Sequence, residues 1–174
     1  QLSLCMIVKN EEANLDSCLK SVRTLVDEII VVDTGSTDRS KEIALSHGAI
    51  IHDFPWNNDF SSARNESLKY ATGEWILILD ADEVLDTNDH SSIRQLIDGK
   101  DVDAYHLVQR TYQKQSTSAD WVSLEEETEL ACGCHGYITS LLVRLFRSNE
   151  QICFKGKVHE QVEIDLLSQN KRIV

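Results

Sequence analysis

Residues 75–85, WILILDADEVL, place four aliphatic side chains, Ile76 to Leu79, directly before two carboxylates. A short, continuous apolar run predicts a buried central strand. In an open α/β sheet, ligands bind at the carboxyl ends of the strands, and Asp80 and Asp82 stand at such an end. Two oxygen donors this close together suit a hard divalent cation, Mg2+ or Mn2+, that would bridge to the phosphates of a substrate. The alternative is that these side chains only cap the next helix.

The composition indicates one acidic globular domain. The chain has 174 residues, of which 41% are hydrophobic and 26% charged, and its formal net charge is −12. This length is enough for one hydrophobic core. The excess of negative charge argues against nucleic acid and anionic membranes as electrostatic partners. A phosphate ligand remains compatible with it, because a bound cation reverses the local sign.

Cellular location is predicted from what the sequence does not contain. No apolar run reaches the roughly 20 residues that a membrane-spanning helix needs, so no membrane span is expected. No signal peptide precedes the first apolar segment, and five scattered cysteines are not a disulfide framework, so we predict a cytoplasmic chain with reduced thiols. Cys132, Cys134 and His135 leave zinc as an alternative, without an identifiable fourth ligand. Because the chain starts at Gln1, we expect it to be a piece of a longer protein.

The first hundred residues alternate between two patterns. Apolar runs at 2–8, 28–32, 49–54 and 75–79 predict strands. Segments with helical spacing follow each of them: 15–25, a helix capped by Ser36 or Thr37 and ending near 46, 61–71, and a helix capped by Asn88 or Asp89. This order predicts a parallel sheet with helices on both faces.

The pattern changes after Gly99. Residues 102–112, 137–146 and 152–154 favour strands, and no further helical repeat is visible. We therefore expect antiparallel strands at one edge of the sheet. The whole is interpreted as one domain, with a nucleotide-type half at 1–100 and a β-rich half at 101–174.

Four further polar residues are candidates for a site. Asp33 ends the second predicted strand and would lie beside Asp80 if the two strands were neighbours; the alternative is an ordinary turn. Arg64 lies in the first part of a predicted helix, where a positive charge is electrostatically unfavourable. Its guanidinium is equally suited to bind a phosphate ligand or a nearby acidic side chain. His159 and Glu160 lie in a predicted loop, where they could complete a metal site and act as a base, or be merely structural.

Taken together, LCMIVKNEE, EIIVVDTGSTDRS, FSSARNESLKYATGEWILILDADE and VRLFRSN...FKGKVHEQV resemble the family 2 glycosyltransferases of the GT-A fold. The resemblance covers nearly the whole chain. The last blocks, with WNNDFSSARN, are similar to a subgroup that is often joined to helical (TPR) repeats and includes enzymes that glycosylate cysteine in bacteriocin peptides.

The resemblance implies a Rossmann-like sheet and a hexosyltransferase-type activity on a nucleoside-diphosphate sugar, a UDP-sugar above all. It implies that Asp33 accepts hydrogen bonds from the nucleobase, that Asn10 and Glu11 line the nucleoside pocket, and that Arg64 holds the nucleotide. It further implies that Asp80 faces the ribose and the metal, that Asp82 ligates Mn2+ or Mg2+, and that His159 contacts the metal or the diphosphate. The family's usual acceptor-side Glu-Asp pair is absent, so Glu160 is the first choice for the base and the run Glu125 to Glu127 the alternative.

These residue types fit an inverting transfer to a hydroxyl or thiol of a glycan, lipid or peptide. The anomeric carbon passes through an oxocarbenium-like state while charge grows on the leaving diphosphate, which a cation stabilises. Two other enzyme classes compete: a nucleotidyltransferase, and a haloacid-dehalogenase-type phosphohydrolase in which Asp80 would be the nucleophile. A non-catalytic nucleotide-sugar binding module is the third alternative.

Overall fold

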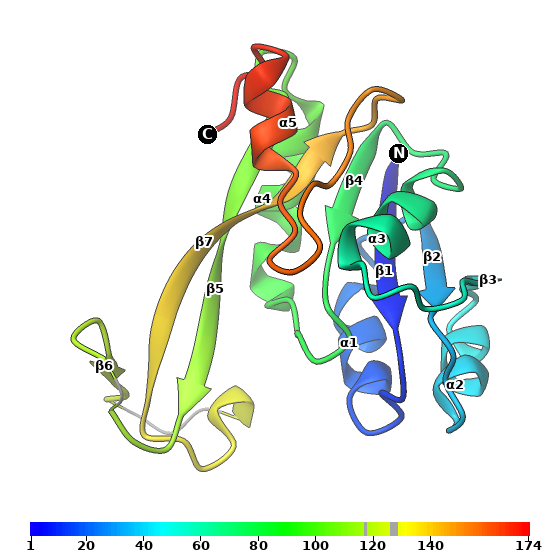
Figure 1. Ribbon diagram of the computed structural model, residues 1–174. Helices are drawn as coiled ribbons and strands as arrows, with labels where there is room; N and C mark the ends of the chain where they lie inside the picture. The colour runs from blue at the N-terminus through cyan, green and yellow to red at the C-terminus, as the bar shows by residue number, and fades with distance from the viewer. Residues whose placement is uncertain (117, 126–128) are drawn as a thin grey trace. The chain divides into compact units, whose positions relative to one another are not determined.

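The computed structural model describes residues 1–116, 118–125 and 129–174. The chain divides into two compact units, of which the first comprises residues 1–105 and 143–174 and the second residues 106–142 (Figure 1). Residues 143–174 therefore belong to the same unit as the predicted nucleotide-type half. The division of function between 1–100 and 101–174 stays a prediction.

A mainly parallel sheet forms the centre of the first unit. Strands β1 (Leu2–Val8), β2 (Glu28–Asp33), β3 (Ile50–Asp53) and β4 (Trp75–Ile78) run parallel in the order β3-β2-β1-β4. The end of β7 (Gly136–Arg147) pairs antiparallel with β4, with Trp75 opposite Arg147. The predicted α/β class, a mostly parallel sheet followed by an antiparallel strand, is confirmed.

Three of the four apolar runs of the first hundred residues form strands that are covered on both faces, whereas β3 is a partly exposed edge strand. Every side chain of β4 is at most 1% exposed, and most of β1 is fully buried. Strands buried on both faces need no polar alternation, which is why these segments are continuous in hydrophobicity. Fully burying one such aliphatic side chain stabilises the fold by roughly 1.5–3 kcal/mol, so substitutions in β4 would be costly.

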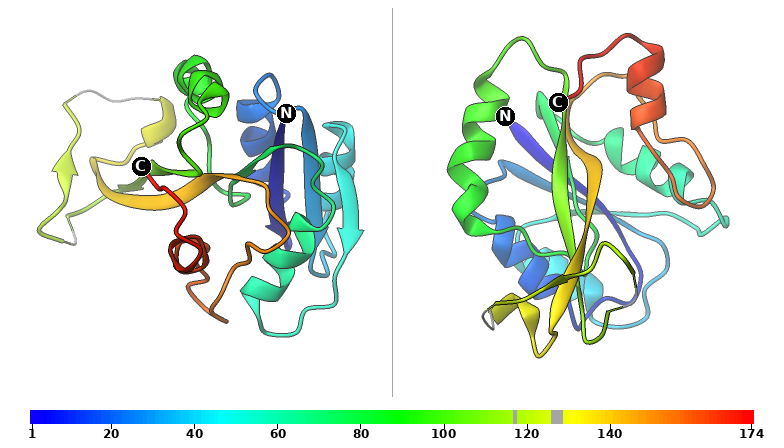
Figure 2. Two further views of the ribbon diagram at one scale, coloured as in Figure 1. Left: turned by 90° about the horizontal axis from the view of Figure 1, so that it is seen from above. Right: turned by 90° about the vertical axis from the view of Figure 1, so that its left-hand side faces the viewer.

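Helices cover both faces of this sheet. In both views of Figure 2, α1 (Leu15–Val22) and α4 (His90–Asp98) lie on one face, and α3 (Phe60–Leu68) and α5 (Glu163–Ser168) on the other. Helix α2 (Ser40–Ser46) packs against α1, and a 3-10 turn, η1 (Thr87–Asp89), precedes α4. Among the described residues, no helix combines the length and the apolar composition needed to cross a bilayer.

The order of the strands corrects one expectation about the site. Strand β1 lies between β2 and β4, so Val8 pairs with Asp33 while Cys5 pairs with Ile78. Asp33 and Asp80 therefore end strands that are not neighbours. Strand order depends on the path of the connections through space, which no local pattern encodes.

The start of α2 differs from its prediction. The helix begins at Ser40, whose backbone N–H donates to Asp38 Oδ1 at 3.0 Å, and not after a cap by Ser36 or Thr37. Ser36 accepts the N–H of Asn10 at 2.9 Å, and the N–H of Thr37 donates to Asn10 Oδ1 at 2.8 Å. These bonds join the loops after β1 and β2, so the two hydroxyl residues serve the loop junction instead of the helix.

The segment after β7 also differs from its prediction. Residues 152–154 are not a strand: a single bridge joins Lys155 to Gln161, and the helix α5 follows. Helix α5 has six residues, too few to show a helical repeat in sequence. Leu166 and Asp165 are buried, and packing of Leu166 in the core, with Phe146 and Phe154 nearby in the same cluster, stabilises the turn.

The second unit is rich in β-structure, which is the character that the sequence predicted for residues 101–174 as a whole. It contains most of β5 (Ala104–Gln113), β6 (Val122–Ser123), a 3-10 turn η2 (Glu129–Ala131) and the first part of β7, with Val122 of β6 opposite Tyr137. A Cβ on Gly136 would lie 2.3 Å from the Trp121 ring, so glycine is required there. The described residues contain no group of three metal-ligating side chains, which gives the zinc alternative at Cys132 no support.

Candidate active site

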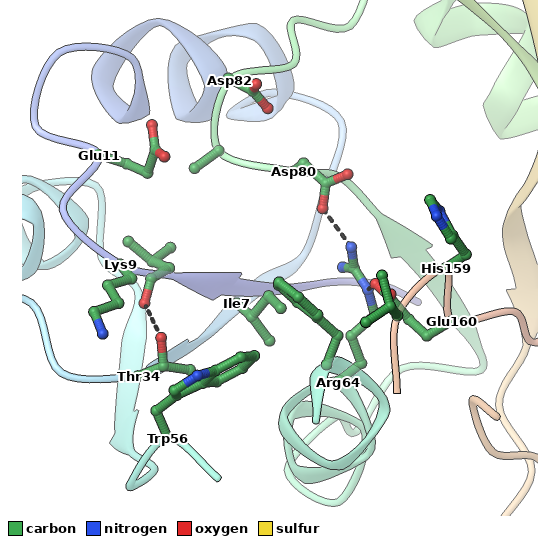
Figure 3. Close-up of a pocket in the computed structure, with 14 residues that line it drawn as sticks. Ile7, Lys9, Glu11, Thr34, Trp56, Arg64, Asp80, Asp82, His159 and Glu160 are labelled. Atoms are coloured by element: carbon green, nitrogen blue, oxygen red, sulfur yellow. Dashed lines mark hydrogen bonds and ion pairs between the residues drawn. The ribbon is translucent and has the colours of Figure 1, made fainter. Parts of the chain in front are cut away.

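A cavity of about 640 Å³ lies at the carboxyl ends of β1, β2 and β4 (Figure 3). Its volume is typical of small-molecule sites, which span roughly 300–1,000 Å³. Of the eight residues predicted from sequence, six line it: Glu11, Arg64, Asp80, Asp82, His159 and Glu160. The sheet thus gathers side chains that are up to about 150 positions apart, as expected for a parallel α/β fold.

Asp80 follows β4 and is held by two arginines. Its Oδ1 pairs with Arg64, and its Oδ2 lies 2.9 Å from Arg144 Nη2. The same Arg144 nitrogen lies 2.8 Å from Glu83 Oε1. Burial acts to raise the pKa of Asp80, but the two guanidinium groups outweigh it and hold that pKa below its ordinary value. Asp80 is therefore a firmly ionised carboxylate at neutral pH.

Arg64 connects α3 to both acidic sides of the cavity. The side chain is 7% exposed, its Nε lies 2.5 Å from Glu160 Oε1, and its guanidinium lies 5.7 Å from the centre of the Phe154 ring. Burial acts to lower the pKa of Arg64, and Asp80 and Glu160 together raise it. Its Nη1 is buried and makes no hydrogen bond to the described protein. Such an orphaned charged donor is costly unless a ligand accepts from it.

Asp82 and His159 are the cavity side chains best suited to a metal ion. Both line the cavity, and neither makes a side-chain hydrogen bond or ion pair with the described residues. The described part of the chain contains no ready-made cluster of three His, Cys, Asp or Glu ligands. Both oxygens of Asp80 already bind arginine, so direct ligation fits Asp82 and His159 better than Asp80. The metal roles of all three stay predictions.

The predicted nucleoside residues fall into two groups. Glu11 lines the cavity, whereas Asn10 is exposed and uses its side chain to join the loops after β1 and β2. Asp33 is 1% exposed; its Oδ1 accepts the N–H groups of Gly35 and Ser36 at 2.9 Å. Its Oδ2 is buried without a partner, and the next residue, Thr34, lines the cavity. Asp33 itself is not among the residues that line the cavity, and its one unused acceptor is buried.

The residues considered for the catalytic base are only partly described. Glu160 lines the cavity, and its Oε1 is bound by Arg64. Glu125 is exposed in the second unit, and Glu126 and Glu127 lie outside the described residues. Glu160 therefore remains the proposal for the base.

Sequence reasoning missed several residues around this cavity. Arg144 and Glu83 complete the charged group around Asp80, and Lys9, Trp56 and Phe60 form part of the cavity wall. Arg144 is visible in sequence as a cation near the end of a strand, but its partner is 64 positions away. The available sequence signal for Trp56 and Phe60 was the presence of two aromatic residues in a polar loop.

One family model and two relatives with similar sequences each match most of this chain. The family model described as Glycosyl transferase family 2 matches residues 3–160. A TPR repeat-containing protein of Synechococcus elongatus is 41% identical over 97% of this chain. The SPbeta prophage-derived glycosyltransferase SunS of Bacillus subtilis is 34% identical over 90% of it. The chain spans about a third of these relatives, 37% and 33% of their lengths.

Solved structures share the fold. Residues 1–349 of S. aureus TarS superpose on this chain with a TM-score of 0.66 at 19% identity. The superposition covers 99% of this chain and 57% of the TarS chain. A second similar structure is glucosyl-3-phosphoglycerate synthase of M. tuberculosis in complex with Mn2+, UDP-glucose and phosphoglyceric acid. Its superposition covers 60% of this chain and 42% of the synthase chain, with a TM-score of 0.52 at 25% identity.

Proposed function

Because the chain belongs to glycosyl transferase family 2, we propose that it is the catalytic domain of an inverting glycosyltransferase with a UDP-sugar donor and a divalent metal ion. The acceptor is a hydroxyl or thiol on a glycan, lipid or peptide. Two facts about similar proteins support the donor and the metal: one relative carries the name glycosyltransferase, and one similar structure holds Mn2+ with UDP-glucose.

One observation carries this proposal. A single cavity presents Asp82 and His159 without protein partners and Arg64 with an unpaired, buried Nη1. A carboxylate and an imidazole are ligands that Mn2+ and Mg2+ sites accept, and a guanidinium is suited to phosphate oxygens. A nucleoside diphosphate with its metal ion satisfies all three groups at once, which a neutral ligand does not.

Each residue then has a distinct task. Asp82 and His159 hold the divalent cation, which when bound stabilises the charge that grows on the leaving diphosphate. Arg64 donates from Nη1 to a phosphate oxygen, and Asp80 keeps its guanidinium in place. Asp33 accepts an N–H of the nucleobase at Oδ2. Glu160 takes the proton of the acceptor, which attacks the anomeric carbon opposite the diphosphate and inverts it.

Calorimetric titration of UDP into the chain, with and without Mn2+, tests this function. We expect binding that requires Mn2+ and that Asp82→Ala abolishes. Asp98→Ala is the matched control, because Asp98 is exposed on α4 and does not line the cavity. It should bind UDP as the wild type does.

The other outcomes separate the alternatives. Binding of GDP or a deoxythymidine nucleotide in place of UDP would keep the family and overturn the donor. Metal-independent binding of UDP that Asp82→Ala does not affect would overturn the metal site. No binding of any nucleotide would overturn the proposed function. Release of UDP from a UDP-sugar, rather than pyrophosphate or free phosphate, would distinguish glycosyl transfer from nucleotidyl transfer and phosphate hydrolysis.

A further inference from the structure

Trp56 is an aromatic wall of the cavity to which the catalytic chemistry assigns no task. It lines the cavity and is partly exposed. Figure 3 shows its indole beside Thr34, on the opposite side of the cavity from Asp80 and Asp82. The phosphate-binding groups and this ring therefore lie at two ends of one space, as a base and a diphosphate do in one nucleotide.

The loop that carries Trp56 is held in place from both ends. Before it, the N–H of Phe54 donates to the carbonyl of Asp33 at 2.8 Å. After it, Asp59 caps α3, and the N–H of Phe60 donates to the carbonyl of Lys157 at 3.1 Å. The rings of Trp56 and Phe60 meet edge to face, with centroids 4.8 Å apart and planes at 69°. The indole is thus preoriented before any ligand arrives.

The loop is also tied to the strand end at which the proposed function places the nucleobase. The backbone N–H of Phe54 donates to the backbone carbonyl of Asp33, and Thr34, the residue after Asp33, lines the cavity together with Trp56. An aromatic face held near this strand end matches a planar base, because every base has a π face that stacks on such a ring.

We propose that Trp56 is the platform on which the nucleobase of the donor stacks. This inference rests on the proposed function, since it assumes a nucleoside-diphosphate donor. Loss of one base–aromatic stack weakens binding by about tenfold or more.

The test compares ligands with and without a base. With Mn2+ present, Trp56→Ala should weaken UDP by about tenfold or more and leave inorganic pyrophosphate unchanged, because pyrophosphate has no base to stack. Trp56→Phe keeps an aromatic face and should retain most of the affinity for UDP.

Tryptophan fluorescence supplies a second readout. Titration with UDP should quench the wild type, and this quenching should disappear in Trp56→Phe. Trp121→Phe is the matched control, because Trp121 lies in the second unit and does not line the cavity. It should keep the quenching.

Three results would overturn the proposal. Trp56→Ala could bind UDP as tightly as the wild type, or lose UDP and pyrophosphate to the same extent, or Trp56→Phe could keep the full quenching. Failure of the proposed function is distinguishable from all of these, because the wild type would then bind no nucleotide at all.

Discussion

Arg144 Nη2 lies 2.9 Å from Asp80 Oδ2, so the end of β7 holds the carboxylate that follows β4. The same nitrogen reaches Glu83 Oε1 at 2.8 Å, and Glu83 Oε2 accepts the backbone N–H of Asp80 at 2.8 Å. Arg144 therefore fixes the turn after β4 as well as the side chain of Asp80. Asp82, which lines the cavity, lies in this turn.

Replacing Arg144 with Met should destabilise the protein by about 2 kcal/mol. This value lies between a buried and a surface ion pair, because Asp80 is still 35% exposed while Arg144 is 13% exposed. Arg144→Lys should recover part of the loss. Chemical denaturation measures both. Arg39→Met is the matched control, since the Arg39–Glu42 pair is about three-quarters exposed and its loss should cost under about 1 kcal/mol. Equal effects of the two Met substitutions would contradict the role of Arg144.

Replacing Glu160 with Gln should separate a base from a positioning residue. If Glu160 takes the acceptor proton, turnover should fall by about a hundredfold or more while the Kd for UDP stays constant. The measurement is release of UDP from the UDP-sugar that binds, together with calorimetry. Glu150→Gln is the control, because Glu150 is exposed and outside the cavity. A weaker affinity for UDP with little loss of turnover would show that Glu160 only holds Arg64.

Asp80 should make folding stability depend on pH in the acid range. Although burial opposes it, Arg64 and Arg144 lower the pKa of Asp80 from the ordinary 3.8. The stability that these pairs contribute is therefore complete above that value and is lost as the pH falls through the lower, folded-state pKa. The unfolding free energies of wild type and Asp80→Asn should differ more at about pH 7 than at about pH 3. A difference that does not change with pH would contradict the ion pairing.

The cysteines should differ in reactivity according to burial. Burial, with a contribution from Glu83, raises the pKa of the Cys18 thiol to about 12, and burial with Glu28 does the same for Cys5. Cys132 is exposed. At about pH 8, iodoacetamide should label Cys132 rapidly and leave Cys5 and Cys18 unmodified in the folded chain. Peptide mapping by mass spectrometry checks this, and labelling of Cys18 as fast as Cys132 would contradict the packing.

Local patterns were sufficient for the parallel sheet and for part of the site. The run Ile76 to Leu79 is continuous in hydrophobicity because β4 is buried on both faces, and the carboxylates that follow it must lie at the carboxyl edge. Helix α5 was not predicted because six residues are too few to show a helical repeat. The predicted cap at Ser36 was wrong because the Ser36 hydroxyl accepts the backbone N–H of Asn10. The first failure comes from the length of the element, and the second from a partner that lies 26 positions away.

The sequence by itself determined the strands of the parallel sheet, the class of fold and the carboxylates at the strand ends, because each depends on neighbours within a few positions. The family resemblance was also visible in the sequence, as four blocks distributed along the chain. Only the tertiary structure decided strand order, the pairing of Asp80 with Arg64 and Arg144, and the place of Trp56 in the cavity wall. Those contacts join segments many positions apart. Their geometry is set by how the sheet and helices pack, and a linear pattern of residue types does not carry that information.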